Sequence, residues 1–282
     1  MPAPKLIAVL PTLLTLGNAV CGFGAITFAA KLGPIGAVGG PAPETIPFIC
    51  ALLVFAAMLF DMLDGSAARL TRQTSELGAQ LDSLCDAVSF GVAPAFLMLQ
   101  FVNSPLLKDR GFPWNPRFLW TIAVLYALCA LLRLARFNVE TDDDDSHDEF
   151  SGLPSPAAAG TVVAFPFAMS ELLNWQKQGT DFERAVADWL IPAVRTLLPL
   201  ITLAVAVLMV SRIRYAHFFN QFLRGPKSRR HVIQLVFATA VIFWIHEVAA
   251  PLIFCWFAFT QPLQSAWREL VTRYWPRGAE ST

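Results

Sequence analysis

Long apolar stretches separated by short polar segments run through this chain of 282 residues. Six of them are close to the roughly 20 residues that a helix needs to cross the hydrocarbon core of a bilayer. They are residues 7–30, 45–68, 78–102, 117–138, 154–174 and 189–211. Residues 231–263 are also apolar but contain Pro251, so they fit either one long kinked helix or two short spans joined by a tight turn.

Composition agrees with a protein whose main solvent is lipid. Hydrophobic residues make up 55% of the chain and charged residues 15%, with a mean hydropathy of +0.53. A net charge of zero offers no basic field for nucleic acid, and no zinc-finger or RNA-binding signature is present. The five cysteines are scattered singly, without the spacing of a metal site or a disulfide framework. We therefore expect an all-α polytopic membrane bundle that does not bind nucleic acid.

The placement of lysine and arginine favours eight spans over seven. With the N-terminus inside and eight spans, most of the 21 Lys and Arg residues fall on the cytoplasmic side, as the positive-inside rule requires. Seven spans would divide them almost evenly. We therefore predict about eight transmembrane helices in a bacterial-type inner membrane. A six-helix core over residues 1–215 precedes a basic cytoplasmic loop, a C-terminal hairpin and a tail over residues 216–282.

Four aspartates lie between two of the apolar stretches, at Asp61, Asp64, Asp82 and Asp86. An aspartate at mid-membrane costs about 2.5–3.5 kcal/mol, so these carboxylates need cations. Spacings of three and four residues put each pair on one face of its helix, and two facing helices would gather all four. Oxygen ligands suit hard divalent cations, and we expect Mg²⁺ or Mn²⁺, in two ions. The predicted topology opens this site toward the cytoplasm.

The residues between these aspartates suit a phosphate-bearing ligand. Gly65, Ala68 and Gly78 leave room near the backbone, Arg69 offers a planar cation for phosphate oxygens, and Ser75 offers a hydroxyl. Metal ions, carboxylates and an arginine together favour phosphoryl-group transfer. A divalent-cation transporter is the alternative from another class. It would place its ligands near mid-membrane on broken helices rather than at helix ends.

The segment from Asp61 to Asp86 resembles the signature of the CDP-alcohol phosphatidyltransferase family. That signature reads D, two residues, DG, two, AR, eight, G, three, D, three, D, and every fixed position is filled here. The resemblance implies transfer of the phosphatidyl group of CDP-diacylglycerol to an alcohol, with CMP leaving. It also implies a homodimer, because relatives in this family are often homodimers.

The resemblance also implies roles for single residues. Asp61, Asp64 and Asp82 would hold one metal ion, and Asp61, Asp82 and Asp86 the second. Asp86 would be the general base that takes the proton of the acceptor hydroxyl. The positions expected to contact CDP-diacylglycerol are Gly65, Ala68, Arg69, Ser75, Gly78 and Thr15.

Three further segments resemble the phosphatidylserine synthase branch of that family: Leu10–Ile26, Leu132–Val139 and Phe150–Gly160. The first carries Thr12, Thr15 and Asn18 as polar positions on an apolar span. This second resemblance implies L-serine as the acceptor, whereas the aspartate motif by itself leaves the acceptor open.

A physical interpretation of the second segment agrees with serine. Arg133 and Arg136 lie three apart near the end of a span and would suit a carboxylate, while Asn138 would take the amino group or order the loop. The alternative for both arginines is that they only anchor the topology. The same chemistry with glycerol phosphate or an inositol compound as acceptor also stays open.

Overall fold

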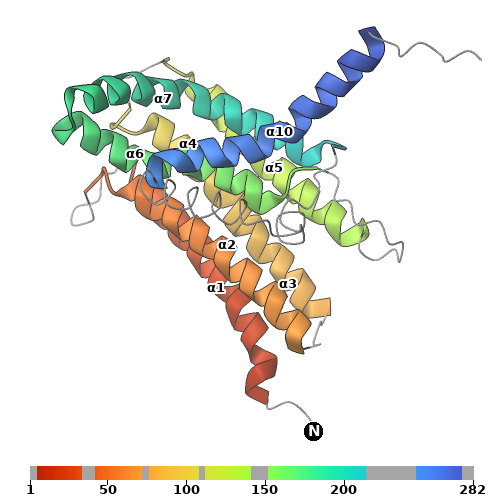
Figure 1. Cartoon of the computed structure of the whole chain (residues 1–282). Coiled ribbons are helices and arrows are strands. Elements are labelled where there is room, and N and C mark those ends of the chain that lie inside the picture. Colours follow the sequence, from red (N-terminus) through yellow and green to blue (C-terminus); the bar gives the residue numbers. More distant parts are fainter. Residues whose placement is uncertain are drawn as a thin grey trace, which may run out of the picture.

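A computed structural model of the chain describes residues 5–33, 42–71, 76–107, 112–140, 152–213 and 246–274. These residues form helices and short connections, without any strand, so the predicted all-α class is confirmed (Figure 1). The helices are α1 (Lys5–Ala30), α2 (Ile46–Thr71), α3 (Glu76–Asp86), the π-helix η1 (Ala87–Val92), α4 (Ala93–Asn103), α5 (Pro116–Glu140), α6 (Ser155–Gln178), α7 (Asp181–Val210) and α10 (His246–Tyr274).

Six helical segments of the described residues are long and apolar enough to cross a membrane. They are Pro11–Ala30, Ile46–Ser66, Leu77–Asn103, Pro116–Val139, Ser155–Gln178 and Asp181–Val210, which confirms the six predicted spans of the core. The last one begins earlier than the predicted residue 189. The reason is a capping box, in which Thr180 and Glu183 satisfy each other's backbone N–H groups at the start of α7.

The structure describes only part of the C-terminal region for which two forms were predicted. Helix α10 runs from His246 to Tyr274 through Pro251 and Pro262, so no tight turn divides residues 246–263. This helix is not among the six segments that are apolar enough to span. Residues 214–245 lie outside the described part. The pair of C-terminal spans and the domain boundary at residue 215 therefore stay predictions.

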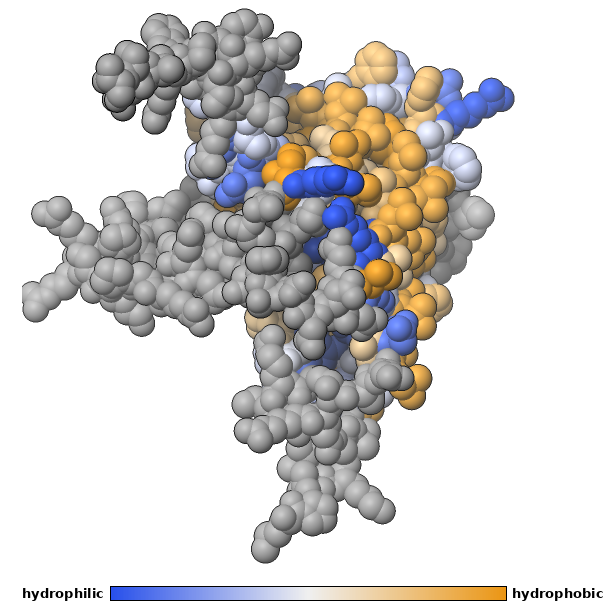
Figure 2. Space-filling model, turned by 90° about the vertical axis from the view of Figure 1, so that its right-hand side faces the viewer, coloured by the Kyte–Doolittle hydropathy of each residue, from blue (hydrophilic) through white to orange (hydrophobic). Residues whose placement is uncertain are grey.

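Helix α1 carries its apolar side chains outward and its small and polar ones inward. Its large exposed residues recur at helical spacing: Leu13, Leu16, Val20 and Phe23. Its buried face consists of Thr15, Asn18, Gly22, Ala25 and Ala29. Such a helix exposes its apolar side to acyl chains, and small inward residues let neighbouring backbones approach closely. Apolar side chains cover much of the surface that is not grey in Figure 2.

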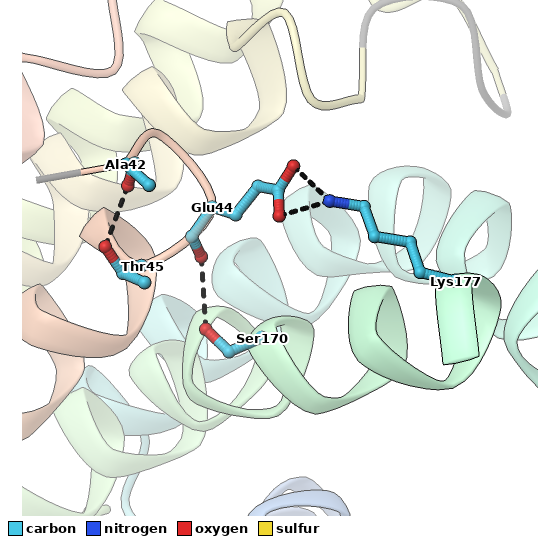
Figure 3. A network of polar contacts seen from close by, with 5 residues as sticks. All are labelled: Ala42, Glu44, Thr45, Ser170 and Lys177. Atoms are coloured by element: carbon cyan, nitrogen blue, oxygen red, sulfur yellow. Dashed lines mark hydrogen bonds and ion pairs between the residues drawn. The ribbon is translucent and has the colours of Figure 1, made fainter. Parts of the chain in front are cut away.

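A polar network fixes the start of α2 against α6 (Figure 3). Lys177 Nζ donates to Glu44 Oε1 at 2.6 Å, and Ser170 Oγ donates to the Glu44 carbonyl oxygen at 3.1 Å. Asp61 lies near the other end of α2, about 22 Å away along the axis at 1.5 Å per residue. The network therefore fixes the N-terminal end of α2, the helix that carries Asp61 and Asp64 near its other end.

The residues before α6 are joined to the end of α7. Gly152 N–H donates to the Ile213 carbonyl oxygen at 2.9 Å, and Leu153 N–H donates to the Leu208 carbonyl oxygen at 3.1 Å. Gly152 has a φ of 88°, a left-handed conformation that favours glycine. A Cβ there would also lie 2.4 Å from the Met209 carbonyl oxygen. Only glycine fits this junction without distortion.

Replacing Gly152 with alanine should therefore destabilise the fold. We expect a loss of about 1–3 kcal/mol from the backbone conformation alone, seen as a lower thermal unfolding midpoint of the purified protein in detergent. Gly24→Ala is the matched control, because a Cβ at Gly24 would come no closer than 3.4 Å to the Leu53 side chain. Equal midpoints for Gly152→Ala and the wild type would contradict the strained junction.

Candidate active site

Three aspartates from two helices meet at one place in the bundle. Asp61 and Asp64 come from α2 and Asp82 comes from α3, and one carboxylate oxygen from each lies within 4.8 Å of the others. Asp64 is buried, whereas Asp61 and Asp82 are half-buried. The predicted meeting of the two helices is thus seen for these three residues, and their roles as ligands stay predictions.

Two oxygens of this cluster have no hydrogen-bond partner in the part of the chain that the structure describes. Asp64 Oδ2 and Asp82 Oδ1 are buried, and neither accepts a hydrogen bond from any described residue. Buried polar atoms without partners are costly and rare. Two such oxygens on adjacent carboxylates are a donor set that suits a divalent cation such as Mg²⁺ or Mn²⁺. The residues present therefore fit the predicted kind of metal ion.

Asp86 lies beside this cluster rather than within it. It is buried at the end of α3, one turn after Asp82, and interacts electrostatically with Asp61 and Asp82. Its Oδ1 accepts a hydrogen bond of 2.9 Å from Nδ2 of Asn18 on α1. One oxygen of Asp86 thus has a neutral donor from a third helix.

Helix α1 also meets the cluster at Thr15, one turn before Asn18. The Thr15 side chain is buried beside the Asp64 carboxylate, and its hydroxyl donates to the Pro11 carbonyl oxygen at 3.0 Å. Of the three polar positions that the sequence showed on the first span, Thr15 and Asn18 thus face the aspartates, whereas Thr12 is exposed.

A π-helical segment, η1, follows Asp86 directly and is held from two sides. Tyr126 Oη on α5 donates to the Phe90 carbonyl oxygen at 3.1 Å, and Ser89 Oγ donates to the Asn18 carbonyl oxygen at 2.9 Å. Segments of this kind occur frequently at functional sites. The sequence analysis missed η1, Ser89 and Tyr126. The available signal was weak, since it amounted to single polar residues within apolar spans.

Open space lies next to the cluster at Gly65. A Cβ built on this residue would meet no described atom within 4 Å. Gly78 on α3 is half-buried. The side chains of Ala68 and Arg69, and the whole of Ser75, lie outside the described residues, so the predictions for these three are not tested. The space at Gly65 agrees with the expectation that a ligand approaches the backbone there.

Arg133 extends from α5 toward the same region. It is half-buried, and its Nη1 donates to Ser155 Oγ at 3.0 Å, at the first residue of α6. Arg133 and Asp86 also interact electrostatically. The predicted acceptor arginine therefore lies near the aspartate that was predicted as the base.

The other two predicted acceptor residues differ from each other. Asn138 is half-buried, and its Nδ2 donates to Oγ of Ser83 at 3.0 Å. Ser83 directly follows Asp82 in α3. Arg136 is exposed. The structure thus connects Asn138 to the helix that carries two aspartates, and it leaves Arg136 on the surface of α5.

Comparison with known proteins gives a consistent result. The profile of the CDP-alcohol phosphatidyltransferase family matches residues 8–208. Three similar proteins are each named CDP-diacylglycerol–serine O-phosphatidyltransferase. The one from Mycobacterium tuberculosis (strain ATCC 25618 / H37Rv) is 34% identical over 161 residues, which are 56% of this chain and 48% of that protein.

The one from Helicobacter pylori (strain ATCC 700392 / 26695) is 34% identical over 166 residues, covering 59% of this chain and 60% of that protein. The one from Bacillus subtilis (strain 168) is 29% identical over 221 residues, covering 78% of this chain and 97% of that protein. The matched region spans about half the length of the mycobacterial relatives and nearly all of the one from Bacillus subtilis.

Removing one carboxylate of the cluster should weaken metal binding. We expect Asp82→Asn to bind Mn²⁺ at least about ten-fold less tightly than the wild type, a difference of about 1.4 kcal/mol. The measurement is titration of the purified protein followed by electron paramagnetic resonance of free Mn²⁺. The control is Asp181→Asn, since Asp181 is exposed at the start of α7. Equal affinity in Asp82→Asn and the control would contradict the site.

Proposed function

The chain belongs to the CDP-alcohol phosphatidyltransferase family, and we propose that it transfers the phosphatidyl group of CDP-diacylglycerol to L-serine, giving phosphatidylserine and CMP. The observation that carries this proposal is the meeting of Asp61, Asp64 and Asp82 from two helices within the region that the family profile matches. The names of the similar proteins support serine as the acceptor.

The proposed metal ligands are the four aspartates. Asp61, Asp64 and Asp82 hold one divalent cation, Mg²⁺ or Mn²⁺, and Asp61, Asp82 and Asp86 hold a second. The partnerless buried oxygens of Asp64 and Asp82 support this assignment. When bound, such ions would neutralise negative charge on the phosphate oxygens of the substrate and on the departing nucleotide.

Asp86 is the proposed general base. Its Oδ1 is engaged by Asn18, so the proton of the serine hydroxyl goes to Oδ2. The serine oxygen then forms a bond to the phosphorus next to the diacylglycerol. The bond between that phosphorus and the oxygen bridging to CMP breaks, and CMP leaves with the electron pair. In the product the phosphatidyl group is esterified to serine.

The nucleotide-lipid is proposed to lie along the inward faces of α1, α2 and α3. The open space at Gly65 supports this placement, because a phosphate there would approach the backbone without a side chain in its way. Thr15 lies beside Asp64 at the same place. The full set of proposed contacts is Gly65, Ala68, Arg69, Ser75, Gly78 and Thr15.

Arg133 is proposed to hold the carboxylate of serine. The carboxylate and the hydroxyl of serine are separated by only two carbon atoms, so both must be held within one small site. Arg133 is suitable because it lies near Asp86, because Ser155 fixes its Nη1, and because its buried Nε has no partner among the described residues. Asn138 and Arg136 are the further proposed contacts of the acceptor.

The second candidate function keeps the chemistry and changes the acceptor to glycerol phosphate or an inositol compound. A phosphorylated acceptor would require a denser basic pocket than a carboxylate requires. The remaining proposals concern context. We place the site on the cytoplasmic side of a bacterial-type inner membrane, in contact with membrane lipids, and we propose a homodimer.

One assay separates the acceptors and tests the base. Purified protein with CDP-diacylglycerol and Mn²⁺ should release CMP when L-serine is added, and not when glycerol phosphate or inositol is added. Asp86→Asn should lower kcat by about 10²–10⁴-fold, because it removes the base. Asp181→Asn should keep the wild-type rate. Release of CMP with glycerol phosphate alone would overturn the proposal in favour of the second candidate.

The acceptor site has its own test. Arg133→Gln should raise the KM for serine by about ten-fold or more, because a charge-assisted hydrogen bond worth about 1.5–3 kcal/mol is lost. The KM for CDP-diacylglycerol should stay within about two-fold. Arg117→Gln, at the exposed start of the same helix, is the matched control. An unchanged KM for serine in Arg133→Gln would leave Arg133 as a structural residue only.

A further inference from the structure

Asn18 is the one neutral side chain that the described structure bonds to Asp86. It is fully buried on α1, outside the aspartate motif, and 68 positions away in the sequence. Its Nδ2 donates to Asp86 Oδ1, while its own Oδ1 has no partner among the described residues. In the opposite orientation of the amide two acceptor oxygens would face each other. The hydrogen bond to Asp86 Oδ1 therefore determines which end of the Asn18 amide faces the carboxylate.

The backbone of Asn18 is fixed to the segment that follows Asp86. Ser89 Oγ donates to the Asn18 carbonyl oxygen at 2.9 Å. One turn further along α1, a Cβ on Gly22 would lie 2.7 Å from Ser89 Cα, so the two backbones are in direct contact there. Asn18 and Asp86 are thus held together twice, once through side chains and once through Ser89.

A third helix completes the arrangement. Tyr126 on α5 is fully buried and donates to the carbonyl oxygen of Phe90, the residue after Ser89. The π-helical segment is therefore held by α1 on one side and by α5 on the other. Because Asp86 directly precedes this segment, its backbone is fixed as firmly as η1 is. What remains is the side chain, and the rotation of its carboxylate is a terminal torsion, which is intrinsically broad.

We propose that Asn18 is a positioning residue of the transfer reaction, which fixes the rotation of the Asp86 carboxylate. By donating to Oδ1 it directs Oδ2 toward the acceptor hydroxyl. This inference rests on the proposed function, because it assigns Asn18 a role only if Asp86 takes the proton. Hydrogen bonds to ionised carboxylates are about twice as strong as neutral ones, so one amide donor is sufficient for this purpose.

The decisive variant is Asn18→Leu, which keeps the branched shape of the side chain and removes the donor. Misplacing a catalytic group by about 1 Å can cost about 10²-fold, so we expect kcat with serine to fall by about 10–100-fold. The KM for CDP-diacylglycerol, the affinity for the first equivalent of Mn²⁺ and the thermal unfolding midpoint should stay close to wild type. This split between kcat and KM separates positioning from a structural role.

Thr202→Val is the matched control. Thr202 is also fully buried in a span, but its hydroxyl donates only to the Leu198 carbonyl oxygen within α7. We expect it to keep the wild-type kcat. If Asn18→Leu fails to fold, Asn18→Ala provides the same comparison, since alanine places no N–H on Asp86.

Three outcomes would overturn the inference. They are an unchanged kcat in the Asn18 variants, a rise in KM that accounts for the whole loss, and a loss of Mn²⁺ affinity and stability that parallels the loss of activity. Failure of the proposed function looks different, because the wild type itself would then release no CMP with serine. An active wild type with an equally active Asn18→Leu therefore removes only the role of Asn18.

Discussion

The cost of holding carboxylates among apolar helices is the constraint on which the rest of this structure depends. Asp61, Asp64 and Asp82 lie within reach of one another, and two of their buried oxygens have no described protein partner. A cluster of this kind is unfavourable until cations bind it. The fold offsets part of this cost, because polar side chains of α1 reach Asp64 and Asp86. What remains unsatisfied is the feature that suits the proposed metal ions.

The packing of α1 makes these polar contacts possible. Its inward face is built from small and polar residues, and its large apolar side chains face outward. Gly22 lets its backbone touch η1, and Ser89 uses that contact to reach the carbonyl oxygen of Asn18. Lipid is as apolar as leucine, so helix contacts inside a membrane depend on such close approach and on hydrogen bonds rather than on burial of large side chains. The geometry near Asp86 follows from that rule.

The second half of the core places a positive charge near the aspartates. Arg133 on α5 lies near Asp86 and donates to Ser155 at the first residue of α6. The residues just before α6 are in turn joined to α7 through Gly152 and Leu153. The proposed acceptor contacts and the aspartates thus belong to one connected body of helices. This arrangement agrees with the proposed reaction, in which the hydroxyl of a small amino acid must lie between one oxygen of Asp86 and the phosphorus that it attacks.

The sequence by itself determined the six spans of the core, the aspartate pairs and the resemblance to a family, because apolar runs and three- or four-residue spacings are local properties of a helix. It left open whether residues 231–263 form one kinked helix or two short spans, and of these the structure describes residues 246–263, which belong to the continuous helix α10. Only the tertiary structure decided that η1 follows Asp86, that Asn18 bonds to it and that Arg133 reaches Ser155. The two hydrogen bonds join residues that are 68 and 22 positions apart. No local pattern encodes them, since they depend on which helix faces which in the folded bundle.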